Sequence, residues 1–252
     1  MPPPEPQLYR IDQTYQDRKT GPNQFVAWLG VRNAGGIRPI TRGGQPGISN
    51  LAALVLVSRN ISGSGYNPWR DTIQPTQGRI FYWGDAKGPK DNKDTRQRDD
   101  FQGNRYLAMV WQAVNEHRWP EVPPILHFSK DEGGTVKFNG LCVLQDLRDA
   151  WFEDDGRRVQ NYHATLDILP VELLDVAWLR SRAGGGPEVH VPRPWEIYSR
   201  SGEHQRLVTW AKMVRSETAT YDGAPGKNRT CDLRFRKPLL YPLSYEGGPL
   251  RE

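Results

Sequence analysis

The segment from about residue 123 to 168 constrains the fold more than any other part of the chain. Three stretches within it, PPILHFSK, TVKFNGLCVLQDLRDAWF and RVQNYHATLDIL, alternate apolar with polar residues and are separated by glycine-containing sequence. A two-residue period is typical of half-buried strands, and EDDG between the second and third stretches favours a hairpin turn. We therefore expect antiparallel strands here and a fold built around a twisted sheet.

Further strands are expected nearer the N-terminus. The apolar sequence ISNLAALVLVSRN predicts a buried strand from about Ala52 to Ser58, because a short run rich in Leu and Val lies between glycine-rich segments. RIFYWGD is the next expected strand. The sequence NQFVAWLGVRNAGG, residues 23–36, is expected to be a strand that enters the fold.

Helices are predicted where apolar residues recur at spacings of three and four instead of two. Leu107, Val110, Trp111 and Val114 recur at spacings of three and four, which indicates a helix from about 104 to 116. PVELLDVAWLRSRA predicts a second helix that starts after Pro170 and ends at GGG. After a proline-punctuated linker at 187–194, EHQRLVTWAKMVRSE predicts a last helix, which makes the domain α+β.

The length of 252 residues favours one large domain. We expect a proline-rich, disordered or extended arm over 1–20, a domain over 21–218, and a tail over 222–252 that lacks helical or strand period. Within the tail, KNRTCD and LLYPLSY can be back-translated to the antisense strand of the T-arm and D-arm of a transfer-RNA gene. The tail is therefore expected to be a non-native extension.

Composition excludes some classes of site. A net charge of +5 allows a polyanionic partner, and 9 Trp and 10 Tyr allow stacking surfaces for bases. The only cysteines, Cys142 and Cys231, support neither a disulfide framework nor a thiolate zinc site, and no His pair has metal-ligand spacing. We expect a cytoplasmic protein without a cofactor, and the absence of a long apolar stretch predicts no membrane segment.

The sequence GRIFYWGDAKGPK, residues 78–90, has two interpretations. In the first, Asp71, Asp85 and Lys87 form a PD-(D/E)xK-like endonuclease site, in which the carboxylates hold Mg²⁺ and the lysine positions water. In the second, aromatic rings and carboxylates form a pocket for a flipped base. The rings are Tyr66, Trp69, Tyr82 and Trp83, and the carboxylates that would contact the base edge are Asp71 and Asp85.

Four segments in order resemble the SRA (SET- and RING-associated) domain: GGIRPITRGGQPGISNLAALVLVS, YNPWRD, GRIFYWGDAK and GNRYLA. The resemblance covers about residues 35–115. The sequence is also similar to the SRA-like N-terminal recognition region of modification-dependent restriction endonucleases of the MspJI and AspBHI type. The resemblance implies an SRA-like (PUA-like) fold, a twisted and partly closed sheet or barrel with flanking helices.

The resemblance further implies a module that flips and binds modified cytosine, 5-methylcytosine or a derivative, in double-stranded DNA. Such a module is part of a modification-dependent restriction system of type IV or type IIM-like character, with cleavage by a separate nuclease domain or subunit. Tyr82 matches the stacking tyrosine, Asp71 matches the carboxylate at the base edge, and Tyr66 or Trp69 would supply the opposite face. Trp83 replaces the family's threonine, and Asp85 is an alternative contact to the base edge.

Basic residues near the loop 88–103 are expected to contact DNA, because this loop lies where the family inserts a finger into the duplex. Several aspartates share the loop, so a solvated surface loop is the alternative. The "N-R" pair of the family corresponds to Asn104 and Arg105, which either contact DNA or hold the fold. The full expected DNA-binding set is Lys87, Lys90, Lys93, Arg96, Arg98, Asn104 and Arg105.

Overall fold

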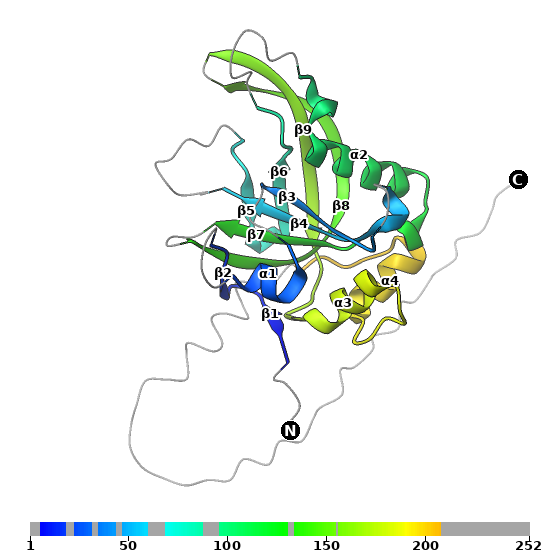
Figure 1. Ribbon diagram of the computed structural model, residues 1–252. Coiled ribbons are helices and arrows are strands. Elements are labelled where there is room, and N and C mark those ends of the chain that lie inside the picture. Colours follow the sequence, from blue (N-terminus) through cyan, green and yellow to red (C-terminus); the bar gives the residue numbers. More distant parts are fainter. Residues whose placement is uncertain are drawn as a thin grey trace, which may run out of the picture.

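The computed structural model describes residues 6–18, 23–31, 35–43, 47–59, 69–87, 96–130, 134–154 and 156–207. The described part is an α+β structure in which a strongly curved sheet carries helices on its flanks (Figure 1). No helix in this part is both long enough and apolar enough to cross a membrane.

The described residues form one eight-stranded and one two-stranded sheet. In the large sheet the order is β3-β4-β7-β8-β9-β6-β5, with β2 paired to β8. All its pairs are antiparallel except β4 with β7. Its strands are β2 (Thr14–Gln16), β3 (Ile37–Thr41), β4 (Leu51–Ser58), β5 (Thr72–Gln74), β6 (Arg79–Trp83), β7 (Ile125–Lys130), β8 (Thr135–Asp154) and β9 (Arg157–Ile168). The small sheet pairs β1 (Leu8–Arg10) with β10 (Leu173–Asp175).

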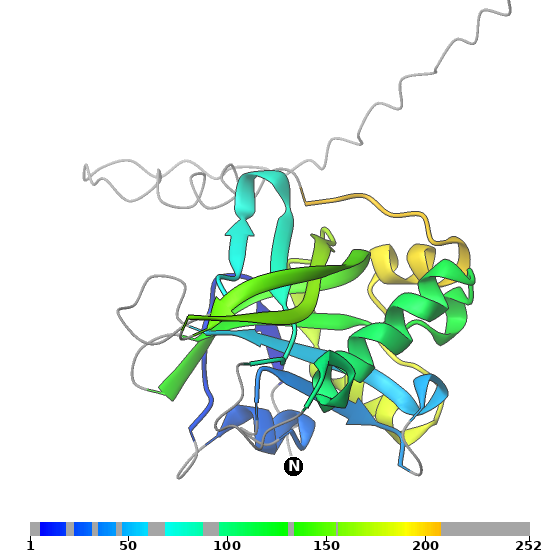
Figure 2. The same ribbon diagram turned by 90° about the horizontal axis from the view of Figure 1, so that it is seen from above.

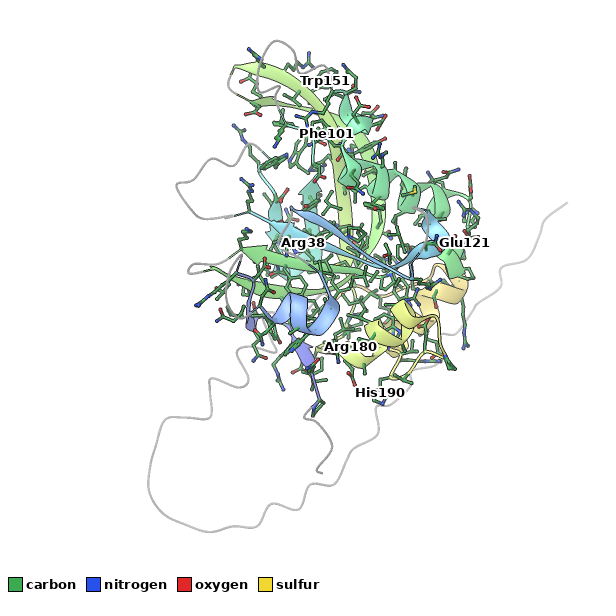
Figure 3. All side chains as sticks on the ribbon, viewed as in Figure 1. Arg38, Phe101, Glu121, Trp151, Arg180 and His190 are labelled. Atoms are coloured by element: carbon green, nitrogen blue, oxygen red, sulfur yellow. The ribbon has the colours of Figure 1, made fainter. Side chains whose placement is uncertain are left out.

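The β8–β9 hairpin confirms the antiparallel strands expected after residue 123. Its pairing runs from Cys142 opposite Ile168 to Asp154 opposite Arg157, at the expected turn. The hairpin extends beyond the body of the sheet, and Trp151 near its far end is 51% exposed (Figure 3). The β4 strand confirms the expected buried strand, since all eight of its residues are buried.

Four α-helices and four 3-10 turns are found in the described part. The α-helices are α1 (Gln24–Leu29), α2 (Gln102–Asn115), α3 (Val176–Gly184) and α4 (Arg193–Ser201). The 3-10 turns are η1 (Ile48–Asn50), η2 (Pro75–Gln77), η3 (Arg98–Asp100) and η4 (Trp119–Glu121). Helix α2 confirms the predicted helix and buries Leu107 and Val110 completely. In both views α2, α3 and α4 lie toward one side of the molecule and the β5–β6 hairpin toward the other (Figure 2).

The strand expected over 23–36 is wrong, because residues 24–29 form helix α1. The helix contacts both α3 and strand β2, and the Arg180 guanidinium donates from Nε to the carbonyl of Trp28 at 2.9 Å. The helix expected directly after Pro170 begins only at Val176. The preceding residues pair with β1, and Asp175 caps the helix by accepting from the Ala177 amide at 2.8 Å.

The segments at both ends also differ from expectation where they are described. Residues 6–18, expected within an arm, include β1 and β2, and Tyr9 is fully buried because it packs into the aromatic core. Helix α4 begins within the expected linker and buries Trp195 and Tyr198. Residues 203–207 are not helical, and the rest of the expected last helix and the tail lie outside the described residues.

Candidate functional site

Asp71 precedes β5 and is almost completely buried, with 6% of its surface exposed. Its Oδ1 accepts a hydrogen bond from the backbone N–H of Trp83 at 2.7 Å, and the Ser58 hydroxyl bonds to the same carboxyl group. Burial raises the pKa of Asp71 to about 7, although both hydrogen bonds act in the opposite direction. The carboxyl group therefore changes its protonation near neutral pH, far above the range of an exposed aspartate.

Tyr82 occupies the inward face of β6 and is 3% exposed. Its ring meets the His127 ring edge-on, with the centroids 5.9 Å apart. Its hydroxyl oxygen lies against the start of β3, because a Cβ added to Gly36 would come within 2.8 Å of it. Burial raises the pKa of Tyr82, and the negative charge of the nearby Asp71 acts in the same direction. Tyr82 and Asp71 therefore share one part of the interior of the curved sheet.

The two neighbouring rings of β6 lie on opposite faces of the sheet. Successive strand residues alternate in direction, so Tyr82 points inward and Trp83 points outward. Trp83 packs against His163 on β9 at 4.8 Å and against Phe152 on β8 at 5.6 Å between centroids. Of these two predicted pocket rings, the structure therefore brings only Tyr82 to Asp71.

Trp69 is half-buried near the same strand end. Its indole Nε1–H donates to the carbonyl of Ala86 at 2.8 Å, and the guanidinium of Arg59 lies over its ring at 5.2 Å from the centroid. These contacts fix the ring beside the segment that follows β6. The other candidate for the opposite face of the base, Tyr66, lies outside the described residues.

Asp85 holds the start of helix α2. Its Oδ2 accepts from the amide of Gly103 at 3.0 Å, while its own amide donates to Oδ1 of Asn104 at 2.7 Å. Asn104 is fully buried and donates from Nδ2 to Asn161 on β9 at 3.0 Å. Burial raises the pKa of Asp85, and the Gly103 amide lowers it. Asp85 and Asn104 thus have structural partners that account for their positions.

The close approach at Gly84 predicts a loss of stability in Gly84→Ala. An added Cβ would lie 2.1 Å from Oδ1 of Asn104 and 2.6 Å from Oδ1 of Asn161, so buried hydrogen bonds must break or shift. We expect the free energy of unfolding in urea to fall by about 2–3 kcal/mol. Gly184→Ala is the matched control, because that helical position has open space around it and should lose no stability. Equal stability of both variants would contradict the close packing of Gly84 against Asn104 and Asn161.

In the set proposed for Mg²⁺, Asp71, Asp85 and Lys87, the two carboxylates have different hydrogen-bond partners. The carboxylate of Asp71 accepts from the Trp83 amide, and that of Asp85 accepts from the start of α2. Within the described ranges, no group of three or more His, Cys, Asp or Glu side chains could hold a metal ion.

The expected DNA-binding cations are distributed over the segment before α2 and its first turn. Arg96 is exposed and lies over the Phe101 ring at 5.0 Å. Arg98 pairs with Asp99 and Asp149 and stacks on Tyr162 at 4.1 Å, so its charge is largely used within the protein. Arg105 is exposed on α2, where it lines a pocket of about 570 Å³. Lys90 and Lys93 lie outside the described residues.

Three buried polar residues that are connected to Asp71 through Ser58 were not predicted as site residues. They are Ser58 on β4, His127 on β7 and Asn139 on β8. His127 has no histidine partner at metal-ligand spacing in the sequence, so the sequence assigns it no site role. The sequence signal that could have indicated these residues is a polar residue within an apolar strand, as in LVLVS and ILHFS. The strand order of the folded sheet is what brings them together.

Solved structures with the same architecture were found by comparison. The chain is 27% identical to "DNA modification-dependent restriction endonuclease AspBHI", with a TM-score of 0.67 over 79% of this chain and 94% of that one. It is 26% identical to "DNA recognition domain of the cytosine modification-dependent restriction endonuclease LpnPI", with a TM-score of 0.67 over 81% and 92%. MspJI in complex with a 27-mer oligonucleotide shares the fold at 19% identity and a TM-score of 0.64, and the chain spans 56% of its length.

Sequence-level comparison identifies the family. No curated protein sequence matches the chain significantly. The family model described as "Restriction endonuclease AspBHI N-terminal" matches residues 9–210. Because this match spans most of the chain, the protein belongs to the family of restriction endonuclease AspBHI N-terminal regions.

Proposed function

We propose that this chain binds double-stranded DNA that contains a modified cytosine and holds the flipped base beside Asp71 and Tyr82. The observation that carries the proposal is the Asp71 carboxyl group, which is buried beside an aromatic ring although its charged form is disfavoured there. Perturbed carboxyl groups of this kind gather at functional sites. The similarity to a DNA recognition domain of a cytosine modification-dependent endonuclease supports the same role.

The chemistry of the two side chains suits this base. A deprotonated Asp71 accepts a hydrogen bond from the exocyclic amine of cytosine, and the Tyr82 ring offers a flat apolar surface for stacking. Tyr82 is 3% exposed, so a base stacks on it only after the groups that cover the ring move aside. Trp69, held by the Ala86 carbonyl, is the described candidate for the opposite face.

DNA cleavage is assigned to a separate nuclease domain or subunit of a modification-dependent restriction system. The two carboxylates required by the nuclease alternative have different partners, which favours recognition over catalysis. We place the protein in the cytoplasm, and we propose that the tail over 222–252 takes no part in binding.

The proposal is tested by titrating the purified chain against matched duplexes that carry cytosine, 5-methylcytosine or 5-hydroxymethylcytosine, with and without Mg²⁺. We expect tighter binding to at least one modified duplex and no cleavage. Equal affinity for all three duplexes would contradict base recognition. Mg²⁺-dependent cleavage that is lost in Asp85→Ala would establish the nuclease function instead.

The salt dependence of the affinity should distinguish phosphate contacts from base contacts. Since cations on the protein displace counterions from DNA, affinity for every duplex should fall steeply with salt, while the preference for modified cytosine changes little. Arg105→Gln should weaken binding to modified and unmodified duplexes alike and reduce the salt slope by about 1. Arg10→Gln, which removes an exposed cation from β1, is the control and should leave the slope unchanged. An unchanged slope in Arg105→Gln would remove Arg105 from the interface.

A further inference from the structure

A row of buried polar side chains connects three neighbouring strands beneath Asp71. Ser58 at the end of β4 and His127 on β7 are both 0% exposed, and Asn139 on β8 is 1% exposed. The Ser58 hydroxyl oxygen lies 2.9 Å from Nε2 of His127, and Nδ1 of His127 lies 3.0 Å from Nδ2 of Asn139. The hydroxyl of Ser58 also bonds to the Asp71 carboxyl group. The four side chains therefore form one continuous hydrogen-bonded row.

The hydrogen bonds of this row all run in one direction, from Asn139 toward Asp71. The Asn139 Nδ2 atom carries only hydrogens to donate, so Nδ1 of His127 is the acceptor. Complete burial lowers the pKa of His127 to about 3, so the ring is neutral and has one N–H. That proton must be on Nε2, which donates to the Ser58 oxygen. The Ser58 hydroxyl proton is then left to point at the carboxyl group of Asp71.

We propose that Ser58 and His127 are positioning residues of the base site, because they hold Asp71 in the orientation and acceptor state that cytosine recognition requires. This inference rests on the proposed function. Asp71 has two fixed donors inside the protein, the Ser58 hydroxyl and the Trp83 amide. A carboxylate held from two sides keeps its remaining lone pairs in place for the exocyclic amine of the base. Ser58 and His127 thus raise the affinity for the modified base without touching DNA themselves.

Other charged groups act on Asp71 less directly. Tyr82 on β6 is the titratable ring beside it, and its phenol is buried and protonated. Asp85 after β6, Arg38 on β3 and Arg59 after β4 act on that phenol with opposite signs. Burial and the two hydrogen-bond donors are therefore the main influences on the pKa of Asp71.

Duplex titration tests the positioning role in four variants of the full chain. Ser58→Ala should weaken binding to the preferred modified duplex about tenfold and change the unmodified affinity by less than about twofold. Ser181→Ala is the matched control, because it removes a half-buried hydroxyl with two hydrogen bonds on α3 and should keep the parent preference. His127→Gln retains an N–H donor and should keep much of the preference. His127→Leu fills a similar volume without a donor and should lose the preference.

A second measurement requires no DNA. The ¹³C shift of the Asp71 carboxyl, followed through pH, should show its midpoint near neutrality in the parent and a higher midpoint in Ser58→Ala, because a donor to the charged form is removed. An unchanged midpoint, or a parent-like preference in Ser58→Ala, would overturn the positioning role. If the parent prefers no duplex while the midpoint shifts, the row exists and the proposed function fails instead.

Discussion

Asp71→Asn should abolish the preference for modified cytosine and at the same time stabilise the unbound chain. The Trp83 amide donates to Oδ1 of Asp71, so it would hold the oxygen of the introduced amide. The amide would then present hydrogens where the base presents its amine, and two donors would face each other. We expect the affinity for modified duplex to fall by about 1–3 kcal/mol, the scale of one lost base-edge contact.

The gain in stability arises from the raised pKa of Asp71. The folded pKa of about 7 lies above the ordinary value of 3.8, so the folded state binds the proton more tightly than the unfolded state. Stability from this group is therefore present below pH 4 and is lost as the pH rises toward 7. At pH 8 the neutral amide avoids this penalty. We expect the free energy of unfolding to rise by up to about 4 kcal/mol, at about 1.4 kcal/mol per pKa unit.

Urea unfolding at pH 4 and pH 8, together with duplex titration, measures both effects. The advantage of Asp71→Asn over the parent should be small at pH 4 and large at pH 8. Asp12→Asn is the control, since it removes the same charge from an exposed pair with Lys137 and should change neither stability nor preference appreciably. A variant that is less stable than the parent at pH 8 would show that the Asp71 carboxylate stabilises the fold.

The long elements were predictable because the spacing of their apolar residues matches the face that each element buries. The β8–β9 hairpin has 12 residue pairs in its ladder, and such length makes local alternation decisive. Short elements depend on partners elsewhere in the chain. Residues 24–29 become a helix against α3, and Leu173–Asp175 becomes a strand because β1 pairs with it. The local sequence of each segment gives no information about these partners.

The candidate site was predictable in part. Resemblance indicated Asp71 and Tyr82, which the structure brings together. Strand alternation alone could have separated Tyr82 from Trp83, since neighbours on a strand face opposite sides. The row from Ser58 through His127 could not be foreseen, because these residues are 69 positions apart and meet only through the parallel pairing of β4 with β7. A polar residue in an apolar strand gives no indication of its partner.

Arg38→Ala should cause the largest loss of stability among single substitutions in the region behind the site. Arg38 lies on β3, the first strand in the order of the large sheet (Figure 3). Its two terminal nitrogens donate to both oxygens of Asp17 at 3.1 and 2.9 Å, and the two side chains are 3% and 0% exposed. Removal of the guanidinium leaves a buried carboxylate without its counter-charge. We therefore expect a loss of about 3–5 kcal/mol in urea unfolding.

The same substitution should also affect recognition through the turn that precedes β3. Nε of Arg38 donates to the carbonyl of Gly35 at 2.7 Å, and the neighbouring Gly36 contacts the Tyr82 hydroxyl. Arg10→Ala, which breaks the exposed pair with Glu172, is the control and should cost less than about 1 kcal/mol. The double variant Asp17→Asn, Arg38→Met removes both charges and should regain much of the stability. If it regains stability but not the preference for modified DNA, the ion pair orients Tyr82; if both return, its role is confined to folding.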